Sequence, residues 1–448
     1  MHEDTMVAIP ATAFLEQEAR ALLTRLAQVR PFVVHETMVA AAMPTPAALS
    51  AVDRFLLEGR RALRHRVEGY LEWLGGPGVR EAPSEQQRRF TIIRLTFNEV
   101  LSQFDLFTEA VTQRSEHRTG VWLSGLDMLA TDALRLPGGF FDAPPLICYL
   151  ARGPGAAIRR ARTRLPGGGE NPIALIRVPR ERMVGHGIAS SLVHEVGHQA
   201  AALLSLVESL RPALLTQLRR VESQAQPAWE CWQRWISEIV ADLWSVAKLG
   251  IGSTLGLFGV VSLPRWFVFR PSGDDPHPIP WIRVQLSCAI GNAMYPDRQW
   301  AELADLWSQL YPRRHAPAVM HQPLAQLEAQ IPPFVEFMLE HQPPALDGAE
   351  LGEVLRLPSR DKDALLTRYA SWRDSPTEFA QASPALAFAV VGQARAAGLI
   401  TPEHESRLLG ELLTGWAIRS SLDTSLLCAR ASLPPIPIAT ALADPLVN

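Results

Sequence analysis

The chain has 448 residues, of which 47% are hydrophobic and 20% charged, and its formal net charge at pH 7 is −3. This composition excludes a largely disordered chain, because burial of so much apolar surface offsets the entropy lost on ordering. A chain without a basic excess is also not expected to bind nucleic acid. The length predicts two or three structural units.

The cysteines favour a reducing compartment. Cys148, Cys231, Cys288 and Cys428 are scattered, with no C-x-x-C pair, whereas a disulfide framework in a secreted protein would be denser. The first 20 residues contain two early acids and no basic segment followed by a long apolar core, so they do not resemble a signal peptide. We therefore expect a cytoplasmic protein.

The first 135 residues predict a helical N-terminal region. Apolar residues recur every three or four positions over residues 14–29, over residues 47–74 and from residue 83 onward, which is the spacing of one helix face. The third of these helices has an aromatic stripe that includes Phe90 and Phe104. Packing in a core explains such a stripe better than a ligand site does.

A small sheet and two amphipathic helices are expected over residues 136–296. The runs Leu146–Leu150 and Ile173–Val178 are rich in residues that favour strands. Helical periodicity follows over residues 188–210 and 227–248. Residues 297–448 predict a helical C-terminal region. The fold class is thus mainly α with a small β-sheet (α+β), with residues 136–296 as a core between two helical regions.

Residues 249–269 are the one candidate for a membrane span. Four glycines lie in the first half of this stretch, and Pro264 and Arg265 lie in its last third. A spanning helix needs about 20 predominantly apolar residues, and this segment meets that criterion only marginally. We expect a buried helical hairpin, or a wall that faces a substrate, rather than a span.

Residues 194–198 form the pattern H-E-x-x-H on a predicted helix. Residues four apart share a helix face, with about 5–6 Å between their Cβ atoms, so His194 and His198 can bind a single Zn²⁺. Glu195 is rotated off that line, where its carboxylate can act on water. The alternative is a helix with two surface histidines, but the neighbouring residues are mostly apolar or small and predict a buried helix. Gly197 costs about 1 kcal/mol relative to Ala in a helix, which indicates close packing or room for a water.

Glu238 is the best candidate for a third zinc ligand. It lies on the next predicted helix, four residues before Asp242, so the two carboxylates share a face. Asp242 can accept the remaining N–H of a ligand imidazole and fix its tautomer. An exposed acidic pair is the alternative, and the apolar neighbours of the pair argue against it. Glu222 and Glu230 are weaker candidates, because their surroundings are more polar.

His277 and Arg283 complete a pattern that resembles a known group of enzymes. H-E-x-x-H is followed by E-x-x-A-D at residues 238–242 and by H-P-x-x-x-x-R at residues 277–283. This order is similar to that of gluzincin metallopeptidases, above all those related to the CaaX prenyl protease and the HtpX-type heat-shock proteases. The resemblance covers residues 186–291, about a quarter of the chain. The membrane helices that flank this core in those families are not evident here, so a prenylated substrate is not implied.

The resemblance implies a zincin-like fold for the core and a role for each motif residue. His194, His198 and Glu238 would be zinc ligands, Glu195 the catalytic base, and Asp242 the support of a ligand imidazole. His277 and Arg283 would lie beside the active site, where they hold substrate or stabilise the oxyanion. In such folds an edge strand pairs with an extended peptide, and the run Ile173–Val178 would be that strand. A strand that only completes the sheet is equally compatible with the sequence.

The sequence therefore predicts a zinc metallopeptidase of gluzincin type that acts on a peptide or protein substrate, with Zn²⁺ as its cofactor. The alternative is a helical interaction or scaffold protein with a structural or vestigial zinc site. Against a purely structural site stands Glu195, because such a site has no use for a base. A third possibility is a protease whose helices cover the cleft until a regulatory partner binds.

Overall fold

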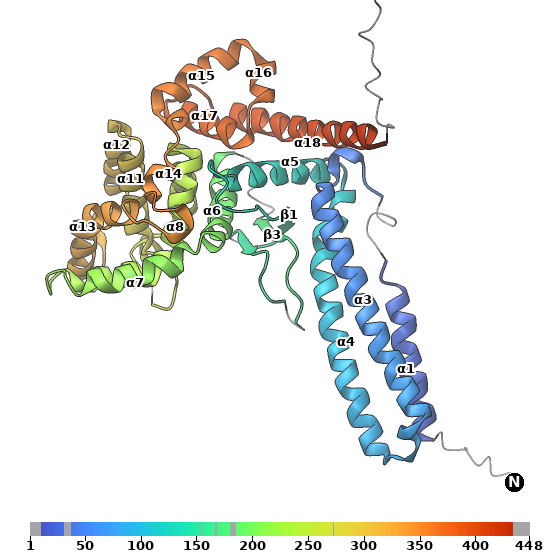
Figure 1. Cartoon of the computed structure of the whole chain (residues 1–448). Helices are drawn as coiled ribbons and strands as arrows, with labels where there is room; N and C mark the ends of the chain where they lie inside the picture. Colours follow the sequence, from blue (N-terminus) through green and yellow to red (C-terminus); the bar gives the residue numbers. More distant parts are fainter. Residues whose placement is uncertain are drawn as a thin grey trace, which may run out of the picture.

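The computed structural model describes residues 10–30, 37–153, 155–165, 168–179, 185–271 and 273–432. Within these ranges the chain is mainly helical with one three-stranded sheet (Figure 1). This confirms the predicted fold class.

Three long helices form an arm that projects from the rest of the molecule (Figure 1). They are α1 (Ala11–Ala27), α3 (Pro46–Gly75) and α4 (Pro83–Thr112). Thr45 caps α3 by accepting a hydrogen bond from the backbone N–H of Ala48, as N-cap threonines do. The predicted aromatic stripe faces inward, and Phe90, Phe97 and Phe104 are buried, so its interpretation as core is confirmed.

The sheet has the order β1-β3-β2, formed by β1 (Leu146–Ala151), β2 (Ala157–Arg159) and β3 (Ala174–Pro179). β3 pairs in parallel with β1 and antiparallel with β2. The predicted run Ile173–Val178 is thus the central strand, and its interpretation as an edge strand is wrong. β2 occupies that edge. It has only three residues, too few to show the alternation from which a strand is predicted.

The sheet is followed by α6 (His186–Leu203) and α7 (Leu206–Leu218). One continuous helix over residues 188–210 was expected, and this expectation is wrong. Ser205 adopts a left-handed conformation with φ of 49°, which ends α6 and turns the chain. The turn allows Leu206 and Leu210 to enter the core.

A hairpin of two helices replaces the candidate membrane span. α8 (Gln226–Leu249) is joined to α9 (Ile251–Val261) at Gly250, whose φ is 57°. A left-handed residue of this kind favours glycine. Most of α9 is buried against α6 and against the C-terminal region. No helix in the described ranges is long and apolar enough to cross a membrane. Within residues 249–269 only α9 takes part in the hairpin, and residues 262–266 are exposed, so the expected burial is confirmed for the first half of the stretch alone.

The C-terminal region is helical as far as the described residues extend, to residue 432. Its last helix packs along α5 (His117–Leu134) and against the turn Ala40–Ala42, just before α3 (Figure 1). α5 belongs to the large core, which also contains α6, α8 and the sheet. The remaining helices are α10 (Arg265–Val268), α11 (Pro280–Met294), α12 (Arg298–Leu310), α13 (Ala318–Leu339), α14 (Leu351–Leu355), α15 (Lys362–Asp374), α16 (Pro376–Gln381), α17 (Pro384–Ala396) and α18 (Pro402–Ser432).

Candidate metal centre

Close packing of α6 on α8 brings the first two motifs together. A Cβ atom at Gly197 would lie 2.9 Å from the backbone Cα and O atoms of Ala241 and 3.0 Å from Cβ of Trp244. Real Cβ atoms do not approach backbone atoms this closely, so only glycine allows this separation of the helices. The prediction that Gly197 marks close packing is confirmed. α8 thereby presents Glu238 to the imidazoles of α6.

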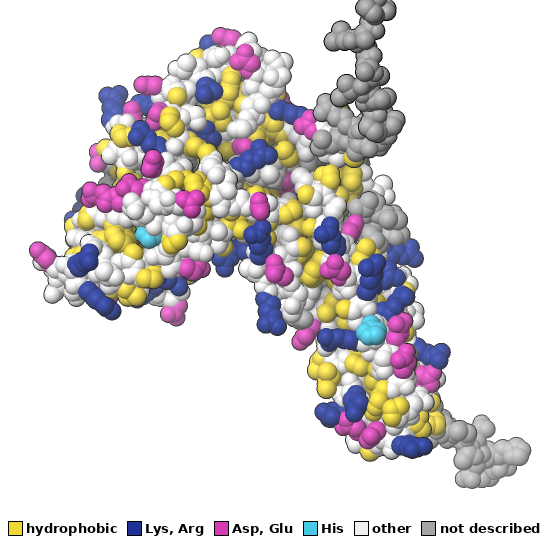
Figure 2. Space-filling view, viewed as in Figure 1, with side chains coloured by type: hydrophobic (Ala, Val, Ile, Leu, Met, Phe, Trp, Pro, Cys, Tyr) yellow, Lys and Arg dark blue, Asp and Glu magenta, His cyan; other side chains and the backbone are white. Residues whose placement is uncertain are grey.

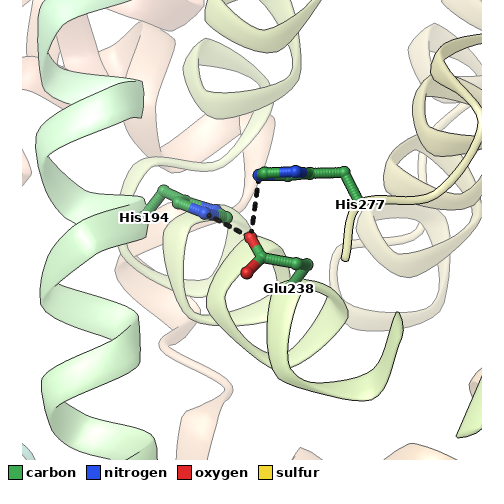
Figure 3. Close-up of side chains that lie close together, drawn as sticks. All are labelled: His194, Glu238 and His277. Atoms are coloured by element: carbon green, nitrogen blue, oxygen red, sulfur yellow. Dashed lines mark hydrogen bonds and ion pairs between the residues drawn. The ribbon is translucent and has the colours of Figure 1, made fainter. Parts of the chain in front are cut away.

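Three imidazoles surround one oxygen of Glu238. Its Oε2 atom lies 3.2 Å from Nε2 of His194, 3.4 Å from Nε2 of His198 and 3.1 Å from Nε2 of His277. Figure 3 shows His194, Glu238 and His277 pointing toward one another from α6, α8 and the loop before α11. The ligand atoms of these three residues all lie within 4.8 Å of one another. Two of the three predicted ligands, His194 and Glu238, therefore group with His277, whereas His198 contacts Oε2 of Glu238 but lies outside this group.

The contacts to Glu238 are short enough for residues that share a zinc ion. Two ligand atoms on a tetrahedral Zn²⁺ with bonds of about 2.0–2.1 Å lie about 3.3–3.4 Å apart. The N···O separations of 3.1–3.4 Å at Glu238 are close to this range and are also those of direct hydrogen bonds. The donor set of imidazole nitrogens and a carboxylate oxygen is also the set that zinc binds in catalytic sites. By contrast, the alternative ligands Glu222 and Glu230 are exposed to solvent.

Asp242 and Arg283 support His194 from behind. Oδ1 of Asp242 lies 2.7 Å from Nδ1 of His194, so Nδ1–H donates to it and Nε2 faces Glu238. Arg283 donates to both oxygens of Asp242, from Nε at 2.7 Å and from Nη2 at 2.9 Å. Such a two-point contact fixes the plane of the carboxylate. Arg283 therefore positions Asp242, and its contact with substrate or an oxyanion stays a prediction.

Asp275 supports His277 in the same way. Its Oδ1 atom lies 2.7 Å from Nδ1 of His277 and also accepts the backbone N–H of His277 at 3.0 Å. Arg270 contacts the other oxygen of Asp275. The sequence analysis assigned no role to Asp275. A carboxylate two residues before a histidine is a local signal that could have identified it, because Asp side chains commonly bond to the backbone two residues on.

The ionisable side chains of the site are buried, and their contacts with one another shift their pKa values. Burial disfavours the charged form of His194, but Asp242 and Glu238 outweigh it and raise the pKa of His194 to about 9. Burial acts to raise the pKa of Glu238, yet its hydrogen bonds with the three histidines hold that pKa well below its usual range. For Asp242, Arg283 and His194 outweigh burial and lower the pKa. Both carboxylates are therefore ionised and able to serve as acceptors or ligands at neutral pH.

Glu195 lies at the wall of a cavity of about 130 Å³ beside the cluster. The side chain is 8% exposed, and it shares the cavity with His194, His277 and Arg283. From the hairpin, Leu257 and Val260 also line this cavity, as do Gly155 and Ala156 just before β2. The interpretation of the motif as a helix with surface histidines is wrong, because His194 and Glu195 are both buried.

A comparison of the chain with protein families, with curated proteins and with solved structures finds no match.

Proposed function

We propose that the protein is a zinc-dependent peptidase of gluzincin type, built on a zincin-like core. The observation that supports this most is the contact of both histidines of H-E-x-x-H with Glu238, 40 positions beyond the second of them, at 3.2 and 3.4 Å. A second support is Glu195, which lines a cavity together with His194 and His277. A carboxylate beside a zinc site, and not needed as its ligand, is the arrangement that peptide hydrolysis uses.

Each side chain has a part in the proposed reaction. Bound zinc supplies a Lewis acid that lowers the pKa of water toward 7 and polarises a peptide carbonyl. Glu195 accepts the proton of the attacking water and passes it to the leaving amine. Asp242 keeps Nδ1 of His194 protonated, so that Nε2 remains available as a ligand. Arg283 and His277 lie on the cavity wall; Arg283 can donate to the developing oxyanion, and His277 can do so only if it does not bind the ion.

The edge strand β2 gives the proposed substrate a place to bind. Among the described strands β2 pairs only with β3, so its other edge can accept an extended peptide through main-chain hydrogen bonds. Gly155 and Ala156, which line the cavity, lead directly into this strand. We propose that peptide or protein substrates bind along β2 and not along β3, the strand that the resemblance suggested. We also propose a cytoplasmic location, in keeping with the free thiols of Cys148, Cys231 and Cys288.

The Glu195→Gln variant tests the reaction. We expect it to bind zinc as the wild type does and to lose about 10²–10⁴-fold in the rate of peptide cleavage, because only the proton acceptor is removed. The measurement pairs zinc content by elemental analysis with cleavage of a peptide library. His65→Ala, in the exposed face of α3, is the control for histidine loss elsewhere. Full cleavage by Glu195→Gln would refute the role of Glu195.

The second candidate is a helical interaction or scaffold protein with a structural zinc site. Two observations favour it. His277 can supply a fourth ligand, and zinc sites with four protein ligands are usually structural. The arm also exposes apolar side chains such as Ile92 and Leu95, and hydrophobic side chains are visible along it in Figure 2. If purified protein contains zinc but cleaves no peptide in a broad library, the scaffold function is preferred.

A further inference from the structure

Two histidines of the site are each held by an arginine–aspartate pair, arranged in the same way. In one, Arg283 contacts Asp242, which contacts Nδ1 of His194. In the other, Arg270 contacts Asp275, which contacts Nδ1 of His277. Both chains end at Oε2 of Glu238, which lies 3.2 Å from Nε2 of His194 and 3.1 Å from Nε2 of His277.

This arrangement is that of metal-binding histidines. A histidine that binds a metal through Nε2 almost always donates its Nδ1–H to a carboxylate, a carbonyl or water, and this donation fixes the tautomer and the ring orientation. Asp275 provides such an acceptor for His277. Nε2 of His277 faces Oε2 of Glu238, as Nε2 of His194 does. With Nδ1–H donated to Asp275, loss of the Nε2 proton leaves the lone pair on Nε2, where it can bind a metal.

His277 also lies within reach of an ion that His194 and Glu238 would share. The ligand atoms of these three residues all lie within 4.8 Å of one another. The distance of 3.1 Å from Nε2 of His277 to the Glu238 oxygen is that of a direct hydrogen bond and is also close to the separation of two ligands of one ion. The position of His277 therefore supports a role as a ligand.

The two chains differ in burial. The side chains of His194, Asp242 and Arg283 are 11–13% exposed, and they come from the packed helices α6, α8 and α11. The side chains of His277 and Arg270 are 42% and 41% exposed. Asp275 and His277 lie in the loop between α10 and α11. Ion pairs between exposed side chains contribute little to stability, so the contacts of His277 hold it less firmly than those of His194.

We propose that His277 is a fourth zinc ligand in the resting protein, aligned by Asp275 and able to leave. This inference rests on the proposed function. With His277 in place, His194, Glu238 and His277 would hold the ion. His198, whose Nε2 lies 3.4 Å from the same Glu238 oxygen, would complete four protein ligands by approaching the ion, and water would then have no position there. Departure of the loop residue opens that position. His277 then acts as a built-in, reversible inhibitor of the peptidase, and the mobile element is the loop rather than a flanking helix.

The test compares wild type, His277→Ala, Asp275→Asn and the control His65→Ala. Zinc affinity is measured by competition with a chromophoric chelator, and the number of bound imidazoles by X-ray absorption of the zinc form. The Co²⁺ form gives a visible spectrum that reports the coordination number. We expect zinc binding about 10–100-fold weaker in Asp275→Asn, as for loss of other groups that support a ligand, and a loss at least as large in His277→Ala. X-ray absorption should show one imidazole fewer in His277→Ala, and the Co²⁺ spectrum should change.

Cleavage separates this inference from the proposed function. If His277 is a releasable ligand, His277→Ala cleaves peptide at least as fast as wild type when zinc is saturating. If zinc affinity and the Co²⁺ spectrum are unchanged while cleavage falls, the inference is overturned and His277 contacts substrate instead. If the wild type binds no zinc, the proposed function fails as well. Should His277→Ala not fold, as judged by its circular dichroism, Asp275→Asn provides the same metal readouts without removing the imidazole.

Discussion

Gly197→Ala is a sharp perturbation of the site, because the substitution touches no proposed ligand and no proposed catalytic group. The new methyl group would lie 2.9 Å from backbone atoms of Ala241, whereas carbon atoms pack at about 3.5–4.0 Å. A helix backbone cannot yield locally, so α6 and α8 must separate by about 0.5–1 Å. The N···O separations of 3.2 and 3.4 Å between α6 and Glu238 would widen by a similar amount.

Gly197→Ala should lower both the free energy of unfolding and the zinc affinity, and the effect on zinc affinity should be the larger. Overpacking costs about 1–3 kcal/mol, and the better helix propensity of alanine returns about 1 kcal/mol, so the free energy of unfolding falls by about 0–2 kcal/mol. Zinc sites tolerate only about ±0.2 Å in their bond distances, so we expect zinc affinity to fall much more, by at least tenfold. Urea unfolding of the metal-free protein and chelator competition measure the two quantities.

Gly187→Ala is the matched control for this experiment. Gly187 also lies on α6, and a Cβ atom there meets nothing within 4 Å, so this variant should bind zinc as the wild type does. If Gly197→Ala binds zinc as tightly as Gly187→Ala, the site does not depend on the close approach of α6 and α8, and the geometric reasoning is refuted.

Three further predictions concern the site and the arm. Asp242→Asn should weaken zinc binding by about 10–100-fold, measured by chelator competition; an unchanged affinity would contradict its support of His194. Because burial is outweighed by Asp242 and Glu238, the pKa of His194 is raised to about 9 in the metal-free protein, so zinc must displace a proton at pH 7. Zinc affinity should thus rise with pH up to about 9, and calorimetry in buffers of different ionisation enthalpy should detect about one proton released; no release would contradict the raised pKa. Phe97→Ala, in the buried core of the arm, should lower the free energy of unfolding by about 3–5 kcal/mol while zinc affinity is retained; a parallel loss of zinc would show that the arm supports the site.

Helices with a regular spacing of apolar residues were predictable from the sequence. The helical period gave α3, α4 and α8 because the spacing of their apolar residues is set within each helix. The placement of His194 and His198 on one face followed from the same period. The break after α6 could not be predicted, because it depends on the left-handed backbone of Ser205, and serine carries no strong signal for that conformation.

The order of the strands was not predictable from local patterns. β1 and β3 were expected as strands, but their parallel pairing and the insertion of β3 between β1 and β2 depend on contacts between distant segments. The run at β3 is almost wholly buried, and a buried run of this kind suits a central strand as well as an edge. The edge was therefore assigned to β3 on the resemblance alone, whereas β2 occupies it.

The sequence predicts that His277 belongs to the site, but it does not show which atoms His277 contacts. The spacing from His277 to Arg283 indicated that both belong to the site, and it is compatible with a substrate contact or with a ligand. The structure adds that Nε2 of His277 faces Glu238 and that Asp275 lies behind Nδ1, and these contacts support the proposed role as a ligand. Displacing His194 or Glu238 would require unpacking helices whose neighbouring tryptophans, Trp235 and Trp244, are buried, whereas His277 can leave by a movement of its loop. Control of the proposed peptidase is therefore expected to act on the segment between α10 and α11.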